Sequence, residues 1–243
     1  MTFVQLVDYT THQPEAMNDL LDKYVAQSHG RRTLTHSIVG KDRDMNDHYV
    51  DVVEFPSYEE AMKNSNLPET DRMFHEMVAL CDGMPKFTNL DVVRDEHLNT
   101  MLVNRVFEEV MLNGNMAVFE ECFATNYIDH DVSKAEQTVV GRDEVMKDVQ
   151  MWRGGFEMSF AVDAQLAQDD LVTTVWTWRG KHTGEFMGMA PTGKTYETTG
   201  TTTFRCTDGM ISEGWWHYDI MRLMREMGMD MNMSADTGMG AAG

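Results

Sequence analysis

The N-terminal part of the chain alternates between two hydrophobic patterns. Residues 3–9 (FVQLVDY) alternate apolar and polar positions, which is typical of a strand with one buried face. Residues 14–27 instead carry apolar side chains at helical spacing, and Pro14 suits the first turn of a helix. Ser57 followed by Glu60 forms a capping-box pattern, which begins a second helical region. We expect strands at 3–9, 33–39, 48–55 and 87–93, and helices at 14–27 and 57–80, the latter interrupted at 64–68. This βαββαβ order is that of a ferredoxin-like module.

The C-terminal part reads as helices followed by long strands. The strand patterns are rich in β-branched and aromatic residues, and Asp208-Gly209 supplies a tight turn between the last two. Trp215 and Trp216 are neighbours on the last strand, so one indole should face the interior and the other the far side. We expect helices at 102–112, 116–123 and 141–152, strands at 160–165, 171–179, 199–205 and 211–218, and a closing helix from 220 to the C-cap Gly228.

The polar stretch RDEHLN at 94–99 suggests a domain boundary. We therefore expect a first domain at 1–97 and a second at 98–230. Residues 231–243 are small, polar and Gly-rich, which predicts a disordered tail.

Composition and short motifs limit the partners and cofactors that we expect for this chain. The formal net charge of −20 argues against nucleic acid and anionic membranes, which repel a protein of this charge. No apolar run approaches the roughly 20 residues that span a bilayer, and the N-terminus lacks the pattern of a signal peptide. The three cysteines are scattered, so we expect a reducing, cytoplasmic location. The chain has no GxGxxG, no P-loop and no metal-ligand spacing, so we expect neither a cofactor nor a metal.

Motifs in the second half resemble a known family. The order is GMAPTGK, a strand ending Phe204-Arg205, the sequence DGMISE, paired tryptophans, Asp219 and LMREMG. Over residues 102–229 this resembles the SnoaL-like polyketide cyclase family, which has the cone-shaped α+β barrel of the nuclear transport factor 2-like fold. The resemblance implies a small polyketide-like or aromatic substrate, and an acid–base group in an apolar cavity.

Residues 50–83 resemble the dimeric α/β-barrel family, which includes antibiotic-biosynthesis monooxygenases. In that family two sheets pack face to face, so the resemblance implies a homodimer. This module contains no tryptophan, and its histidines fall mostly near predicted turns or helices. We expect it to serve dimerisation or structural support rather than catalysis.

The Asp and His that form the catalytic pair in the cyclase family are absent from the matching positions of this chain. Aligned without gaps, the Asp position falls on Trp216 and the His position on Thr202. The candidate acid–base residues are therefore His130 and Asp129, within Asp129-His130-Asp131, and Asp219 near the end of the last strand. The alternatives are that the triplet is a hydrogen-bonded loop and that Asp219 caps the following helix. The expected substrate-binding residues are Tyr127, Trp152, Trp176, Trp178, Thr202, Trp216 and Tyr218.

Strand alternation places Trp216 and Tyr218 on one face, with Glu213, Trp215 and His217 on the other. A β-bulge would invert this assignment.

The sequence is compatible with three functions. The first is cofactor-free cyclisation, isomerisation or hydrolysis in natural-product biosynthesis. The second is a non-catalytic ligand-binding or chaperone-like protein, which the loss of the Asp and His favours. The third is cofactor-independent oxygenation of an aromatic substrate, which the resemblance of the first module suggests.

Overall fold

The computed structural model describes residues 2–131 and 138–228. The chain forms two compact units, residues 1–95 and 96–243. The boundary expected at 97/98 lies two residues later than this division. The expected tail, 231–243, lies outside the described residues.

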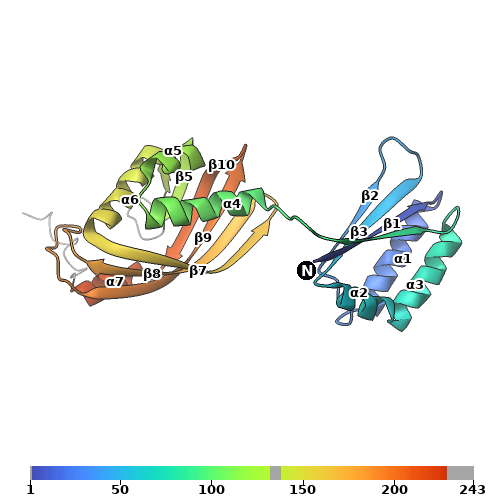
Figure 1. The fold of residues 1–243 in the computed structure, drawn as a ribbon. Coiled ribbons are helices and arrows are strands. Elements are labelled where there is room, and N and C mark those ends of the chain that lie inside the picture. The colour runs from blue at the N-terminus through green and yellow to red at the C-terminus, as the bar shows by residue number, and fades with distance from the viewer. Residues whose placement is uncertain (1, 132–137, 229–243) are drawn as a thin grey trace, which may run out of the picture. The chain divides into compact units, whose positions relative to one another are not determined.

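The N-terminal unit is a four-stranded antiparallel sheet with helices on one face (Figure 1). The strand order is β2-β3-β1-β4, so the first and third strands pair at the centre. Helix α1 and strand β3 have the predicted bounds, and the second helix is broken in two. The elements are β1 (Phe3–Thr10), α1 (Pro14–Gln27), β2 (His36–Lys41), β3 (His48–Phe55), α2 (Tyr58–Ser65), α3 (Pro68–Leu80) and β4 (Lys86–Asp91).

The two faces of this sheet differ in what covers them. Phe3, Val7 and Tyr9 of β1 point towards the helices and are buried, and Val7 and Tyr9 pack with α1 and α3. The Ser57 hydroxyl caps α2 by accepting a 3.3 Å hydrogen bond from the Glu60 N–H, as the capping-box pattern predicts. On the other side of the sheet lies an apolar surface that no helix of this unit covers. We call it the open face, and it is made of Val4, Leu6, Ile38, Val50, Val52 and Leu90.

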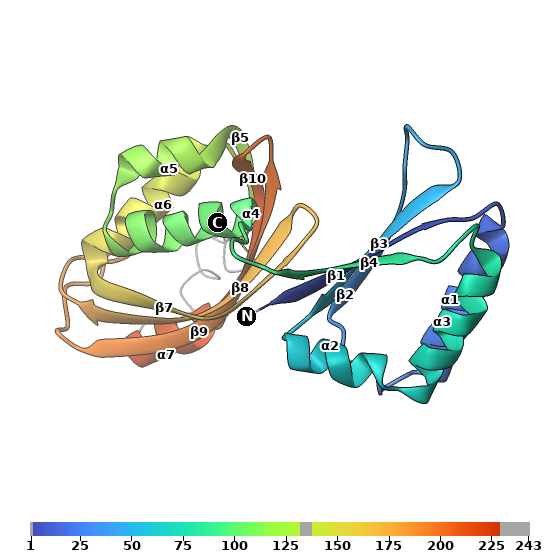
Figure 2. The same cartoon turned by 45° about the vertical axis from the view of Figure 1, so that its right-hand side comes forward.

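The C-terminal unit is a sheet covered by helices (Figure 2). Its six described strands have the order β6-β5-β10-β9-β8-β7. Among the strand pairs of the described residues in this unit, only β5–β10 is parallel. The helices are α4 (Leu98–Arg105), which continues as the π-helical turns η1 (Val106–Leu112), α5 (Met116–Cys122), α6 (Arg142–Gly155) and α7 (Ile220–Met227). The strands are β5 (Phe123–Asp131), β6 (Thr138–Val140), β7 (Phe156–Gln168), β8 (Leu171–His182), β9 (Thr195–Thr207) and β10 (Met210–Tyr218).

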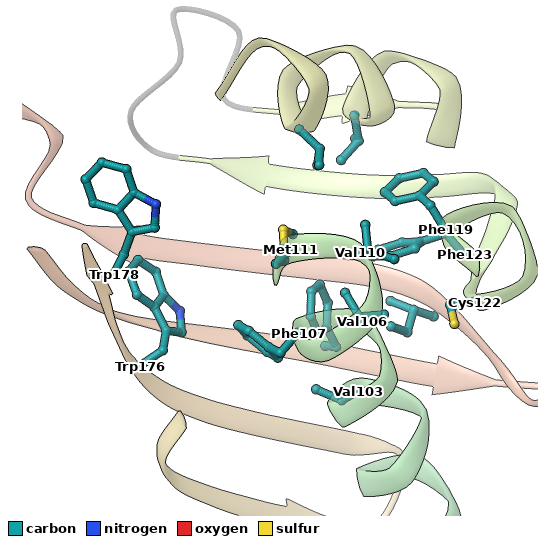
Figure 3. Close-up of a cluster of buried hydrophobic side chains, with 14 of the residues drawn as sticks. Val103, Val106, Phe107, Val110, Met111, Phe119, Cys122, Phe123, Trp176 and Trp178 are labelled. Carbon is teal, nitrogen blue, oxygen red and sulfur yellow. The ribbon is translucent and has the colours of Figure 1, made fainter. Parts of the chain in front are cut away.

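A core rich in aromatic rings joins the helices to the sheet in this unit. Phe107 and Met111 of η1 point towards Trp176 and Trp178 of β8, as Figure 3 shows. The Phe107 ring packs edge-on against Phe160 of β7, with ring centroids 5.9 Å apart. Helices and sheet together agree with the α+β class that the resemblance implies for the second half.

Glycines make room for rings on the inner face of this sheet. A Cβ atom built on Gly200 would lie 2.4 Å from the Trp176 ring. A Cβ atom on Gly214 would lie 2.1 Å from the Tyr127 hydroxyl. Both distances are shorter than van der Waals contact, so these positions require glycine for packing.

The triplet Asp129-His130-Asp131 ends strand β5, so the alternative that it is a hydrogen-bonded loop is wrong. The inward residues of this strand include Tyr127, Asp129 and Asp131, so polar groups stand where a strand normally shows apolar ones. Within the described residues, no helix is long and apolar enough to cross a membrane.

Candidate active site

A cavity lies between the inner face of the C-terminal sheet and the helices η1 and α6. The space that the centre of a water molecule can reach in it measures about 100 Å³. Most of the lining is aromatic or aliphatic, with a few polar groups, which is the usual character of a small-molecule site. The lining residues are Met111, Asp129, Asp131, Val145, Asp148, Val149, Trp152, Met158, Phe160, Trp176, Trp178, Thr198, Trp216 and Tyr218.

Three carboxyl groups line this cavity. Asp129 and Asp131 alternate with His130 on β5, so both point inward, and Asp148 comes from α6. Only 2% of Asp129 and 7% of Asp131 is exposed to solvent. Buried carboxylates require hydrogen-bond partners, because losing water without compensation costs several kcal/mol.

Tyrosine hydroxyls supply some of those partners. Tyr127 Oη donates a 3.0 Å hydrogen bond to Asp129 Oδ1. Tyr218 Oη donates to Asp131 Oδ2 at 3.4 Å. Burial, and then the negative charge of Asp129, raise the pKa of Tyr127 well above its ordinary value. Tyr127 is therefore protonated at neutral pH and remains the donor in its pair with Asp129.

Tryptophans form much of the apolar wall. Trp152 belongs to α6, Trp176 and Trp178 share the inner face of β8, and Trp216 lies on β10. The Trp152 and Trp178 rings meet edge to face with centroids 5.6 Å apart. Flat surfaces in this arrangement suit a planar apolar ligand.

Trp216 and Tyr218 face the cavity, in agreement with strand alternation from the sequence. A register shift does occur in β10, between Ile211 and Glu213. It precedes the tryptophan pair, so it does not invert the assignment of Trp215 and Trp216.

His130 lies on the opposite face of β5, which corrects the expectation that it works in the cavity with Asp129. Its Nε2 is 2.9 Å from Glu213 Oε1, and its ring stacks on Trp215 at a centroid distance of 5.3 Å. Glu213 also accepts a 3.1 Å hydrogen bond from Arg205 Nε. Burial acts to raise the pKa of Glu213, but its hydrogen bonds with His130 and Arg205 outweigh burial and lower it. These contacts give His130 a place in a surface network rather than in the site.

Three other predicted site residues do not line the cavity. Asp219 caps α7, where its Oδ1 accepts a 2.8 Å hydrogen bond from the Arg222 N–H. Thr202 is fully buried, and its hydroxyl accepts a 2.8 Å hydrogen bond from Trp176 Nε1. Tyr127 is fully buried behind Asp129. Thr202 and Tyr127 thus hold lining residues in place, and Asp219 belongs to the helix end.

Asp131, Asp148 and Thr198 line the cavity but were not among the expected site residues. Asp131 could have been found by treating 127–131 as a strand, because residues two apart share a face. For Asp148 the signal is its spacing of four residues from Trp152 on one helix, which places both on one side. Thr198 carries no signal of this kind in the sequence.

The lining combines flat apolar rings with a wall of carboxyl and hydroxyl groups. At that wall, carboxyl oxygens of Asp129 and Asp131 accept hydrogen bonds from the hydroxyls of Tyr127 and Tyr218. No group of three or more His, Cys, Asp or Glu side chains suited to a metal ion occurs within residues 2–131 and 138–228.

Comparison with known proteins finds a family match in the C-terminal unit. A family model described as SnoaL-like polyketide cyclase matches residues 101–227. A solved structure of a candidate polyketide cyclase from Acidithiobacillus ferrooxidans is 18% identical, with a TM-score of 0.50, and the match covers 57% of this chain and 98% of that one. IdmH from Streptomyces antibioticus is 26% identical with a TM-score of 0.47, covering 54% and 99%. A candidate SnoaL-like polyketide cyclase from Jannaschia sp. CCS1 is 22% identical with a TM-score of 0.49, covering 56% and 94%. No curated protein matches the chain.

Proposed function

Because this chain belongs to the SnoaL-like polyketide cyclase family, we propose that its C-terminal unit closes a ring in a polyketide-like or aromatic small molecule. The ring closure forms a carbon–carbon bond with proton transfers and no net change of oxidation state, so we propose that it is cofactor-free. The observation that carries the proposal is Asp129, a carboxyl group 2% exposed that faces an aromatic-lined cavity. Isomerisation or hydrolysis would use the same carboxyl group on a related substrate.

The chemical step we propose is an intramolecular aldol reaction. Asp129 takes a proton from the carbon between two carbonyl groups, which leaves an enolate. The enolate carbon then forms a bond to a second carbonyl carbon of the same molecule, whose oxygen becomes an alkoxide. The proton returns from Asp129 to that alkoxide, so no atom or electron is gained or lost. Tyr218 lines the cavity, and its hydroxyl would donate to a substrate oxygen that replaces Asp131 as its acceptor.

The aromatic wall has the role of holding the substrate folded. Reacting carbons must lie close and aligned before the bond can form, and a rigid pocket supplies that order in advance. Trp176 is fixed by its hydrogen bond to Thr202, so its ring cannot turn freely. Thr202 therefore acts as a positioning residue.

Proton exchange tests the proposal without the natural substrate. A small β-keto ester is incubated with the protein in D₂O, and loss of its α-proton signal is followed by NMR. We expect wild-type protein to accelerate exchange and Asp129→Asn to lose the acceleration. Equal exchange with wild type and Asp129→Asn would contradict the proposed role of Asp129.

A non-catalytic binding protein is the second candidate. It is favoured by Trp216 and Thr202, which occupy the positions where the resemblance places the family's Asp and His. Neither an indole nor a buried threonine hydroxyl can serve as the acid–base pair. Tight binding of the keto ester with no acceleration of exchange would select this function.

For the N-terminal unit we infer a ferredoxin-like module of the dimeric α/β-barrel type that pairs two copies of the chain. The support is its β2-β3-β1-β4 antiparallel order and its open face. Ile38 and Leu90 on that face are 49% and 41% exposed. A contiguous apolar surface of this kind in a sheet is typical of an interface.

A further inference from the structure

Two tryptophans of β8 line the cavity of the C-terminal unit, but their N–H groups have different partners. Trp176 and Trp178 lie on the inner face of the strand, and each is 3% exposed (Figure 3). Trp176 Nε1 donates a 2.8 Å hydrogen bond to the hydroxyl oxygen of Thr202. Trp178 Nε1 donates instead to Met158 Sδ, at a distance of 3.3 Å. The two N–H groups therefore differ in what they would gain from a ligand oxygen.

The acceptor of the Trp178 N–H is a poor one. A thioether sulfur accepts hydrogen bonds weakly, whereas a hydroxyl or carbonyl oxygen accepts them well. A buried N–H with a weak acceptor recovers little of the free energy that it lost on leaving water. A carbonyl oxygen in place of Met158 Sδ would therefore be a better partner for Trp178. Trp176 would gain nothing from such an exchange, because Thr202 already supplies an oxygen.

A ligand can make this exchange because the contact between Trp178 and Met158 lies at the cavity, which both side chains line. Met158 belongs to β7, and its unbranched side chain has three rotatable bonds, so it can turn away from the indole. The Trp178 ring is held more firmly. The rings of Trp152 and Phe156 meet it edge to face, at centroid distances of 5.6 Å and 5.2 Å. A fixed donor thus stands beside an adaptable acceptor.

The Trp178 N–H and the proposed base approach the cavity from different strands. Trp178 belongs to β8 and Asp129 to β5, and strands β9 and β10 lie between them in the sheet. An oxygen bound to Trp178 therefore belongs to a part of the ligand other than the carbon that gives its proton to Asp129. A few placed polar groups fix the orientation of a ligand that an apolar pocket alone would let turn.

We propose that Trp178 determines specificity for a substrate with a carbonyl oxygen remote from the reacting carbon, and that this oxygen replaces Met158 Sδ as the acceptor of the indole N–H. The inference rests on the proposed function, since it takes the ligand of the cavity to be the substrate of ring closure. The Trp178 N–H then decides which end of that substrate lies at β8.

Two probes of nearly the same shape test the exchange. Cyclopentanone carries a carbonyl oxygen, and methylenecyclopentane has a CH₂ group in its place. A single small ring is suitable because the cavity measures about 100 Å³, whereas about 150 Å³ holds benzene. The full chain, with ¹⁵N in its tryptophans, is titrated with each probe, and the indole N–H signals are followed by NMR.

We expect cyclopentanone, and not methylenecyclopentane, to move the Trp178 N–H signal downfield, because the N–H exchanges sulfur for oxygen. The Trp176 signal should respond alike to both probes, because its N–H stays bonded to Thr202. The Trp178 signal is the one that shifts in Met158→Leu and is missing from Trp178→Phe.

Variants should change the preference for cyclopentanone over methylenecyclopentane in opposite directions. Trp178→Phe keeps an aromatic ring without the N–H, so this ratio of affinities should fall roughly tenfold, the factor of one ordinary hydrogen bond. Met158→Leu removes the competing sulfur and keeps the indole, so the ratio should rise about threefold or more. Trp176→Phe is the matched control. It alters a neighbouring ring whose N–H is bonded to Thr202, so the ratio should stay that of the wild type.

Circular dichroism establishes that each variant is folded, and Met158→Leu preserves the test if Trp178→Phe does not fold. The proposal is overturned if cyclopentanone leaves the Trp178 signal in place. It is also overturned if the ratio is the same in wild type, Trp178→Phe and Met158→Leu. These titrations involve no proton transfer from carbon. A failure of the ring-closure proposal, seen as equal exchange with wild type and Asp129→Asn, is therefore a separate outcome.

Discussion

The hydroxyl of Tyr127 donates a 3.0 Å hydrogen bond to Oδ1 of Asp129 inside the C-terminal unit. Gly214 on the neighbouring strand leaves the room for that hydroxyl, since a Cβ atom there would lie 2.1 Å from it. The fully buried tyrosine thus fixes one oxygen of a carboxyl group that faces the cavity.

Tyr127→Phe tests whether this fixed position matters for turnover. Without the donor, the buried Asp129 loses a hydrogen bond, so we expect unfolding to become easier by about 1–3 kcal/mol. We also expect kcat to fall while KM changes little, because Tyr127 does not reach the substrate. Because the pKa of Tyr127 lies well above its ordinary value, its titration should not appear in the pH profile of the wild type near neutrality.

Tyr196→Phe is the matched control, because Tyr196 is also buried but its hydroxyl contacts Thr192 outside the cavity. A drop in kcat of the same size for Tyr196→Phe would argue against a positioning role for Tyr127.

Asp51 predicts a pH dependence of stability in the N-terminal unit. Burial raises its pKa to about 6 in the folded protein, against an ordinary value of 3.8. Between pH 3.8 and about pH 6, Asp51 holds its proton more tightly in the folded state than in the unfolded state. Stability therefore falls as the pH rises through this range. The total decrease in the free energy of unfolding, complete above pH 6, is about 3 kcal/mol. Of this, about 1 kcal/mol is lost between pH 5 and pH 7. Asp51→Asn removes this slope.

Hydrogen exchange of the β1 and β3 amides, compared between wild type and Asp51→Asn at pH 5 and pH 7, measures the difference. The wild type should lose protection relative to the variant as pH rises. Parallel behaviour of the two proteins would mean that the pKa of Asp51 is not raised.

Charge on the open face should separate the proposed dimer. Ile38→Asp places a carboxylate in the apolar surface, where pairing would bury it without a partner. We expect light scattering to show a dimer for the wild type and a monomer for Ile38→Asp. Met45→Asp should remain dimeric, since Met45 is 53% exposed in the turn between β2 and β3. A wild type that is monomeric at micromolar concentration would contradict the proposal.

Most elements could be predicted from the sequence because their inner faces are apolar. Helix α1 and strand β3 have the predicted bounds, since Met17 and Leu20 of the helix and Phe55 of the strand point into cores. Strand β7 begins at Phe156, four residues before the predicted start, and it contains a register shift between Val162 and Ala164. That shift breaks the alternation inside the predicted range 160–165, but it does not explain the earlier start.

The candidate site could be predicted only in part. The tryptophans Trp176, Trp178 and Trp216 were found because strand spacing assigns their face. Strand β5 was missed because its inward positions include Asp129 and Asp131, which read as solvent-exposed groups. Unless residues 123–131 are recognised as a strand, the sequence does not show that His130 points to the face opposite Asp129 and Asp131.

The account's central claim is that Asp129, not His130, moves the proton. One assay compares kcat of wild type, Asp129→Asn and His130→Ala on the same cyclisation substrate, with circular dichroism to verify folding. Asp129→Asn should lower kcat by about 10²–10⁴, the range typical of a lost acid–base group. His130→Ala should stay within a few-fold of wild type, since His130 contacts Glu213 and Trp215 on the far face. Near-normal turnover by Asp129→Asn together with a large loss in His130→Ala would contradict the claim.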